Sequence, residues 1–316
     1  TTESRGLGDV YKRQTLPYDA FSPHQDIISE RLSTLQHLRQ ARCGLLTVPV
    51  STLMQRVPPL SYLDGACFEL VCGATFDVAN QRLALESAGY QCVETVTERG
   101  QYAVRGALMD IYPMGAALPV RIDLFDDEID TLRTFDPDSQ RTVERIERLD
   151  LLPAKEFPFD DAAVARFREQ WHDLFQVDVR QCSIYQDVSS YIAPNGVEYY
   201  LPLFFDELAT LFDYLPTDAI FITEAGMAAA AQTFEGDVNN RYESLRHDVE
   251  RPVLAPQKLY LGADELNQRL SARRRIVLGG EHPKHQCAFA SQPLPELRVD
   301  AKAETPAHLL QQYVER

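Results

Sequence analysis

Hydrophobic and polar residues alternate most regularly between residues 101 and 138, which read as consecutive strands joined by tight turns. In the stretch VRIDLF, residues 120–125, a valine, an isoleucine and a leucine alternate with Arg121, an aspartate and Phe125. Successive side chains of a strand point to opposite faces, so the first set is predicted to face a core and the second to face outward. Phe125 therefore falls on the polar face beside Arg121, just before an acidic turn.

Two interpretations of Phe125 are open at this point. An aromatic ring beside an arginine on an outer strand face is the composition of a protein-interface hot spot. Alternatively, the ring lies at a strand end and tucks under its own hairpin or an adjacent helix. The alternation alone favours this second, packed arrangement.

These strands belong to a predicted strand-rich α+β domain over residues 67–152. One helix is expected over 77–87, where Gly89 stops it. Strands are expected over 92–97, 101–104, 107–112, 119–125, 128–135 and 142–151. Short strands punctuated by Gly, Pro and Asp indicate a mixed or antiparallel sheet with a helix on one face.

The chain on either side of this domain alternates between helices and strands. Residues 15–66 are predicted to contain a helix that Pro23 opens, a short strand over 45–48 and a second helix with Ser51 as its N-cap. Residues 153–278 are predicted to contain a helix over 162–175, a strand over 219–223, a helix through 228–231, and strands over 258–261 and 275–278. We expect both flanks to form one α/β layer into which the strand-rich domain is inserted.

The two ends of the chain are set apart. Residues 9–14, DVYKRQ, match the translation of a transposon end used to build sequencing libraries, so residues 1–14 are expected to be an unstructured sequencing or cloning artefact. Residues 279–316 turn to Pro, His, Ser and Gln and are predicted to be a linker and the start of a next domain. Both ends are expected to be truncated.

Charge and cysteine content narrow the function classes. The net charge is −16, and DNA binding is largely phosphate neutralisation by Lys and Arg, so a broad electrostatic grip on DNA is not expected. No apolar run approaches the ~18–20 residues of a membrane span, so no membrane partner is expected. The six cysteines show no paired framework, which fits a reducing cytoplasm and a cytoplasmic location.

Motifs for catalysis or cofactor binding are not found, and no cofactor is expected in this part of the protein. The phosphate-binding pattern G-x-x-x-x-G-K-[ST] does not occur. An acidic pair at 206–207 has the outline of a magnesium site, but Pro202 interrupts the strand before it. No nucleophile has a recognisable activating context. His282, His285 and Cys287 lack a second ligand pair, so a zinc site is not predicted.

Long ordered stretches carry a resemblance to a known family. They are LPYDAFSPHQDIISERLSTL, VPVSTLMQRV, QYAVRGALMDIYPMG and LPVRIDLFDDEIDTLRTFDPDSQRT, followed by LLPAKEFPFD, GVEYYLPLFF and LFDYLP. Together they closely resemble the N-terminal module of the bacterial transcription-repair coupling factors, the Mfd family, over residues 16 to about 275. The resemblance implies an incomplete RecA-like (helicase-type) layer in two parts, 15–66 and 153–278, with a UvrA-binding domain, 67–152, inserted between them.

That module is itself similar to the excision-repair helicase UvrB, and the differences are informative. UvrB has a long tyrosine-rich hairpin that threads damaged DNA, whereas here the chain passes from Phe21 straight to the helix that Pro23 opens. The aspartate–glutamate pair of UvrB is replaced by Glu224 and Ala225, which removes the second carboxylate. The resemblance thus implies a helicase-shaped scaffold with neither damage probe nor motor.

The resemblance implies that the module keeps a docking surface for UvrA, the damage-recognition ATPase. The implicated positions correspond to Arg105 in YAVRGAL, Arg121 in PVRID and Phe125 in DLFDD. An arginine presents a planar fork that pairs bidentately with a carboxylate, and a neighbouring ring excludes water. The alternative for both arginines is an ion pair within the domain, with Asp123 or Asp130 as candidate partners of Arg121.

The resemblance therefore implies an adaptor that recruits UvrA to stalled RNA polymerase in transcription-coupled nucleotide excision repair. It further implies a parent protein that binds RNA polymerase, translocates on double-stranded DNA with ATP and Mg outside these residues, and masks the UvrA face with its own C-terminal domain. The alternative is a UvrB-type excision-repair helicase subunit with ATPase activity. A third possibility is a stand-alone interaction protein of the same fold.

Overall fold

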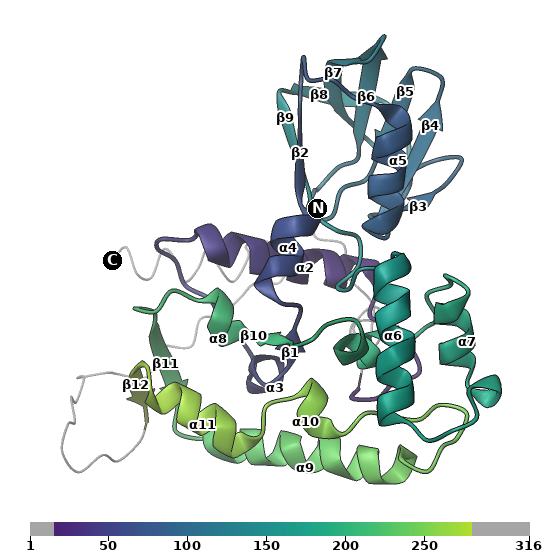
Figure 1. The fold of residues 1–316 in the computed structure, drawn as a ribbon. Coiled ribbons are helices and arrows are strands. Elements are labelled where there is room, and N and C mark those ends of the chain that lie inside the picture. The colour runs from purple at the N-terminus through teal and green to yellow at the C-terminus, as the bar shows by residue number, and fades with distance from the viewer. Residues whose placement is uncertain (1–15, 280–316) are drawn as a thin grey trace, which may run out of the picture. The chain divides into compact units, whose positions relative to one another are not determined.

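The structure is a computed structural model, and it describes residues 16–279. In chain order, a strand-rich domain follows one mostly helical flank and precedes another; its strands and helix are labelled in Figure 1. Its elements are α5 (Val78–Ser87) and the strands β2 (Phe68–Val71), β3 (Gln91–Cys92), β4 (Gln101–Arg105), β5 (Leu108–Ile111), β6 (Val120–Phe125), β7 (Glu128–Phe135), β8 (Thr142–Ile146) and β9 (Arg148–Leu151).

The flanks hold the remaining elements. Before the domain they are α2 (Gln25–Gln40), α3 (Val50–Leu53), β1 (Arg56–Val57) and α4 (Leu60–Ala66). After it they are α6 (Asp161–Leu174), the 3₁₀ helix η1 (Val179–Gln181), α7 (Ser183–Ser189), the 3₁₀ helix η2 (Val197–Leu203), β10 (Ala209–Thr210), α8 (Leu211–Tyr214), β11 (Ile220–Glu224), α9 (Met227–Leu245), α10 (Pro256–Leu259), α11 (Ala263–Ser271) and β12 (Arg274–Leu278).

The strand-rich domain is built on a six-stranded sheet with the order β3-β4-β5-β6-β7-β8. β3 pairs with β4 in parallel, and every other neighbouring pair in this sheet is antiparallel. β2 and β9 form a separate antiparallel pair through which the chain enters and leaves the domain. The predicted mixed sheet with one helix is confirmed, although the strand expected over 142–151 is divided into β8 and β9, and the strand expected over 92–97 is reduced to the two residues of β3.

α5 covers one face of this sheet. It begins at Asp77, whose side chain accepts hydrogen bonds from the backbone N–H groups of Ala79 and Asn80, as a good N-cap does. It ends before Gly89, where a φ of +87° turns the chain in a conformation that favours glycine. Leu85 of α5 is buried in one hydrophobic cluster with inward side chains of the central strands, among them Tyr102, Met109, Ile122 and Leu132.

The flanks contain two further features of the core. α2 is amphipathic as predicted, and its Leu32 and Leu35 are buried. A second cluster, rich in aromatic rings, gathers around Phe167 and Trp171 of α6. Their ring centroids lie 5.5 Å apart.

Strand pairing in the flanks is limited within residues 16–279. β11 and β12 form a parallel pair, and β1 and β10 form an antiparallel pair. An α/β class is consistent with this mixture, but one continuous layer across both flanks is not observed in the described part of the chain. The sequence separation of β11 and β12, with α9, α10 and α11 between them, is that of a crossover connection.

Three local predictions in the flanks were wrong. Residues 45–48 form no strand, because they are largely exposed and no other described strand pairs with them. Residues 258–261 are not a strand either, because Pro256 occupies the first turn of α10, where its fixed φ favours a helix. The cap of α3 is Pro49 rather than Ser51, which lies inside the helix.

The predictions for residues 1–14 and for 280–316, including the proposed linker and the dismissed zinc ligands, lie outside the described residues. Within residues 16–279 no helix has both the length and the apolar character that crossing a membrane requires.

Candidate protein-interaction surface

The face of the six-stranded sheet opposite α5, here called the outer face, carries all three predicted docking residues. Residues paired across neighbouring strands share a face, and Arg105 pairs with Leu108, which in turn pairs with Asp123. Arg121 and Phe125 lie two residues to either side of Asp123 on β6, so they point the same way. The sheet thus brings Arg105, Arg121 and Phe125 onto one surface from two strands that are not neighbours.

Phe125 is strongly exposed on this surface. It ends β6 opposite Glu128, and the hairpin turn after it holds Asp126 at a φ of +53°. The residue is 73% exposed, so its ring is not covered by its own hairpin or by α5. The packed arrangement favoured by the alternation alone was therefore wrong, and the exposed arrangement is found.

Arg105 is also exposed, at the end of β4. Its Nη2 donates a hydrogen bond of 2.6 Å to the backbone carbonyl of Glu94 and lies 3.5 Å from the hydroxyl of Thr95. No carboxylate lies within ion-pair distance of it among the described residues. The carbonyl contact orients the guanidinium but does not offset its charge, so Arg105 remains available to an acidic partner.

Arg121 is placed differently. Its Nε and Nη2 donate to the two carboxylate oxygens of Asp110 on β5, at 2.7 and 2.9 Å. The side chain of Asp110 is only 4% exposed and that of Arg121 is 19% exposed. The guanidinium carbon lies 4.8 Å from the ring centroid of Phe135. Arg121 therefore makes an ion pair within the domain, but with Asp110 rather than with Asp123 or Asp130.

Arg121 stays charged in this pair, and the neighbouring acid on the outer face has a partner of its own. The hydrogen bonds to Asp110 raise the pKa of Arg121 above its ordinary value, so the guanidinium stays charged. The neighbouring acid on the outer face, Asp123, accepts from Thr131 and forms its own ion pair with Arg133. Asp110 and Asp123 are thus both committed to arginines of the same sheet.

One end of the outer face is closed and the other is open. At the closed end, Val96, Ala103, Tyr112 and Phe135 form a small buried cluster of their own. At the open end, Leu108 lies between Arg105 and β6, and it is 37% exposed. Leu108 therefore adds an apolar residue among the docking candidates, one that was not predicted from the sequence.

Comparisons with known proteins support this assignment of the domain. Residues 68–157 match the family model described as the UvrB interaction domain, a range that includes the whole outer face. The chain is 47% identical over 306 residues to a transcription-repair-coupling factor of Escherichia coli (strain K12), covering 96% of the chain and 27% of that protein. The corresponding protein of Haemophilus influenzae (strain ATCC 51907 / DSM 11121 / KW20 / Rd) is 45% identical over the same shares. The resemblance to the transcription-repair-coupling factors is confirmed.

Similarity extends to more distant members of the same family. A transcription-repair-coupling factor of Myxococcus xanthus is 29% identical over 279 residues, which is 84% of the chain and 23% of that protein. The chain spans about a quarter of the length of these relatives.

Two positions correspond to the acidic residues of a UvrB-type motor. Residues 204–207 follow the 3₁₀ helix η2 rather than a strand, and Asp206 forms an ion pair with Arg166. At the end of β11, Glu224 is followed by Ala225, whose backbone N–H donates to the carbonyl of Leu278. No group of three potential metal ligands occurs among residues 16–279, and the described cysteines form no disulfide.

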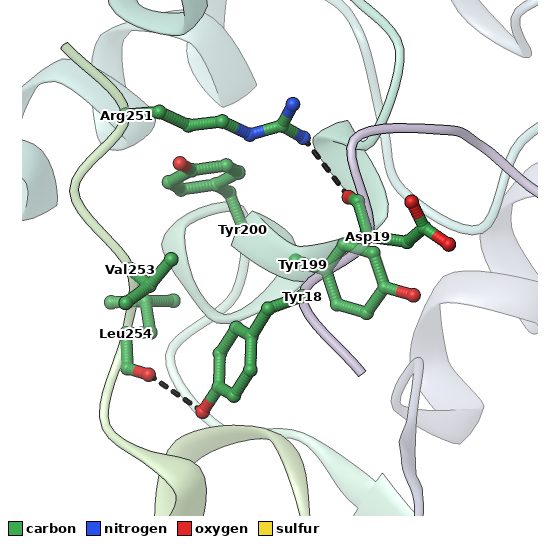
Figure 2. Close-up of a pocket in the computed structure, with 7 residues that line it drawn as sticks. All are labelled: Tyr18, Asp19, Tyr199, Tyr200, Arg251, Val253 and Leu254. Carbon is green, nitrogen blue, oxygen red and sulfur yellow. Dashed lines mark hydrogen bonds between the residues drawn. The ribbon is translucent and has the colours of Figure 1, made fainter. Parts of the chain in front are cut away.

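A small cavity outside the strand-rich domain has a structural role. Figure 2 shows its lining, in which Tyr18 donates a hydrogen bond of 2.8 Å to the carbonyl of Leu254. Arg251 donates to the backbone carbonyl of Asp19 at 3.2 Å. The cavity measures about 10 Å³, which is room for one water molecule at most. These contacts fasten the start of the described chain to the segment before α10.

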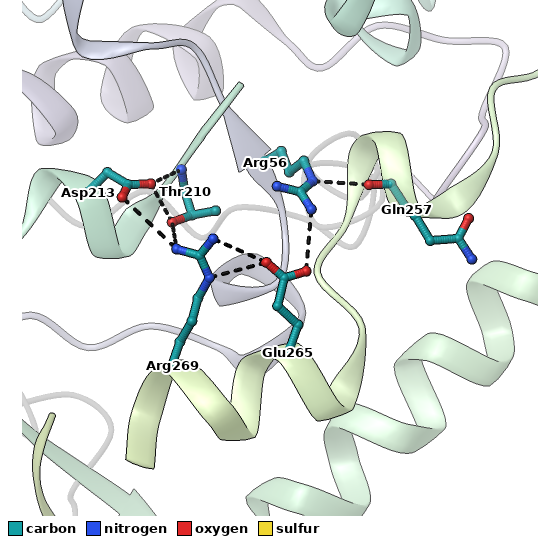
Figure 3. Close-up of polar contacts among 6 residues, drawn as sticks. All are labelled: Arg56, Thr210, Asp213, Gln257, Glu265 and Arg269. Atoms are coloured by element: carbon teal, nitrogen blue, oxygen red, sulfur yellow. Dashed lines mark hydrogen bonds and ion pairs between the residues drawn. The ribbon is translucent and has the colours of Figure 1, made fainter. Parts of the chain in front are cut away.

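A polar network near α11 is likewise structural. Arg269 of α11 donates to Glu265 at 3.1 and 3.2 Å and to the hydroxyl of Thr210 at 3.2 Å (Figure 3). Glu265 also pairs with Arg56 of β1 at 3.3 Å. The network connects β1, β10 and α11, and each charged group in it has a partner within the protein.

Proposed function

We propose that this chain is the UvrA-recruiting part of a transcription-repair-coupling factor, an adaptor in transcription-coupled nucleotide excision repair. One observation carries the proposal. A domain that matches the UvrB interaction family exposes Phe125 and Arg105 on the same side of one sheet. The similarity to transcription-repair-coupling factors along 96% of the chain supplies the biological context.

The chemistry of this surface defines what UvrA would have to offer. Phe125 needs an apolar pocket, because burying an exposed ring is the main source of energy at a hot spot. Arg105 needs a carboxylate, because it has the charge and the free donors for a bidentate contact. Leu108 fills the space between them, and Arg121 adds a guanidinium whose position is already fixed.

The flanks are proposed to be part of a RecA-like layer. Parallel strands are normally covered on both faces, whereas every residue of β12 and the apolar side chains Ile220 and Ile222 of β11 are exposed. This exposure is what an incomplete layer would show if residues outside 16–279 completed it. The replacement of the second carboxylate by Ala225 supports a scaffold without hydrolytic activity.

Further properties of the parent protein are proposed from the family alone. They are binding of RNA polymerase, ATP- and Mg-dependent translocation on double-stranded DNA, and masking of the UvrA face by the C-terminal domain. A cytoplasmic location is proposed on the same basis.

The experiment is capture of purified UvrA by the purified 316-residue chain, measured by biolayer interferometry. Saturable binding by the parent, lost in a variant carrying Arg105→Ala and Phe125→Ala, is the expected result. Equal binding by parent and variant would refute the docking assignment. An ATPase assay on the same preparation addresses the alternative, because nucleotide turnover would indicate a UvrB-type helicase subunit.

A further inference from the structure

Arg121 differs from the other docking residues in being held from two sides. Asp110 binds its Nε and Nη2 with short, nearly equal hydrogen bonds of 2.7 and 2.9 Å. The guanidinium carbon lies over the ring of Phe135, 4.8 Å from its centroid, and Phe135 is fully buried. A bidentate pair fixes the rotation of the guanidinium plane, and the ring fixes its height above the sheet.

This arrangement leaves part of Arg121 available. The Nη1 group donates to no other residue among those the structure describes, and the side chain is 19% exposed. Asp110 lies beside Arg121 on the same face, because the two residues are directly paired across β5 and β6, and its carboxylate takes the Nε and Nη2 edge of the guanidinium. The remaining donors therefore point away from Asp110.

We propose that Asp110 and Phe135 are positioning residues of the UvrA-docking surface, which hold Arg121 in the orientation that UvrA recognises. This inference rests on the proposed function and deepens it. A long side chain loses rotamer freedom when a partner immobilises it, and an arginine that is already fixed avoids most of that cost. The outer face thus presents one fixed guanidinium, Arg121, and one adaptable guanidinium, Arg105.

Removing the Asp110 charge has two effects of opposite sign, which makes the inference testable. If Asp110 acted only through its charge, its neutralisation would make the outer face more positive and would strengthen binding to a carboxylate of UvrA. If Asp110 positions Arg121, its neutralisation frees the guanidinium and weakens binding. The direction of the change therefore decides between the two.

The experiment measures the affinity of the Asp110→Asn variant of the 316-residue chain for UvrA by biolayer interferometry. We expect affinity to fall about 3- to 10-fold, which corresponds to immobilising one long side chain. The matched control is Asp123→Asn, which removes the same charge from the same face and breaks an ion pair with Arg133 instead. We expect this control to bind UvrA at least as tightly as the parent.

Two further variants separate positioning from folding. Asp110→Asn should cause no further loss in an Arg121→Ala background, because nothing is left to position. Arg121→Lys keeps an ion pair with Asp110 but cannot form the two-pronged contact, so it should bind UvrA more weakly while its melting temperature stays close to that of the parent. This variant tests the inference even if Asp110→Asn folds poorly.

The outcomes that overturn the inference are distinct from those that overturn the proposed function. Parent-like or tighter binding by Asp110→Asn, or parent-like binding by Arg121→Lys, refutes positioning. If these variants bind normally while Phe125→Ala loses UvrA, the docking surface stands and only the role of Asp110 fails. If the parent chain does not bind UvrA, the proposed function itself is wrong.

Discussion

Replacement of Phe125 by alanine removes the largest exposed apolar group of the outer face. A fully buried phenylalanine covers about 150–250 Å². Because Phe125 is 73% exposed, roughly 110–180 Å² of it remains for a partner to cover. At about 25 cal/mol per Å², this area sets an upper limit of about 3–4.5 kcal/mol on its contribution. Imperfect burial lowers this, and we expect a loss of about 2–3 kcal/mol in UvrA binding.

The assay for Phe125→Ala is titration calorimetry with purified UvrA, and the expected loss corresponds to an affinity about 30- to 150-fold weaker. The free energy of unfolding should change by less than about 0.5 kcal/mol, since the ring packs on little in the free protein. Leu83→Ala is the matched control, because Leu83 is 63% exposed on α5, which covers the opposite face. An affinity of Phe125→Ala within about twofold of the parent, or an equal loss in the control, would refute the reasoning.

Three other perturbations have defined outcomes. Arg105→Ala should weaken UvrA binding most at low salt, since this guanidinium has no carboxylate partner among the described residues; equal weakening at all salt concentrations would contradict this. Glu156→Gln should lower the free energy of unfolding in urea by about 3 kcal/mol, because it leaves the partly buried Arg31 without its ion-pair partner; a loss below about 1 kcal/mol would contradict it. Burial lowers the pKa of Lys155 from 10.5 to about 8, so the folded state resists its charge. Lys155→Met should therefore be more stable than the parent at pH 7, and this advantage should shrink as the pH rises from about 8 to 10.5, as followed by thermal unfolding.

The strand-rich domain was largely predictable because its pattern is local. Each strand from β4 to β7 shows alternation in its own residues, and each turn contains Gly, Pro or Asp at the required place. The helix α5 was predictable for the same reason, because local residues set both of its ends: Asp77 caps its start and Gly89 follows its last turn. The alternation correctly placed Phe125 on the outer face, but it did not predict that the ring would be exposed there.

The flanks were harder to predict because their structure depends on distant contacts. Residues 45–48 have the composition of a strand but find no partner among the described strands, and a strand needs one for its hydrogen bonds. The stretch before residue 261 has a similar apolar composition, yet Pro256 begins a helical turn there. The carbonyl of Met54 accepts from the backbone of Leu261, more than two hundred residues away, and no local pattern contains that information.

Arg121 shows that the alternation along a strand does not predict every contact of a side chain. Alternation correctly places it on the outer face, but it cannot say which residue of the neighbouring strand lies opposite, because that depends on register. The register pairs Arg121 with Asp110, an acid between Met109 and Ile111 that has to find a partner if the strand is buried. One ion pair therefore satisfies a buried carboxylate and orients a surface arginine at once. Under the proposed function, this double role would let a mostly covered group contribute to docking, because its exposed edge is small but its orientation is already set by Asp110.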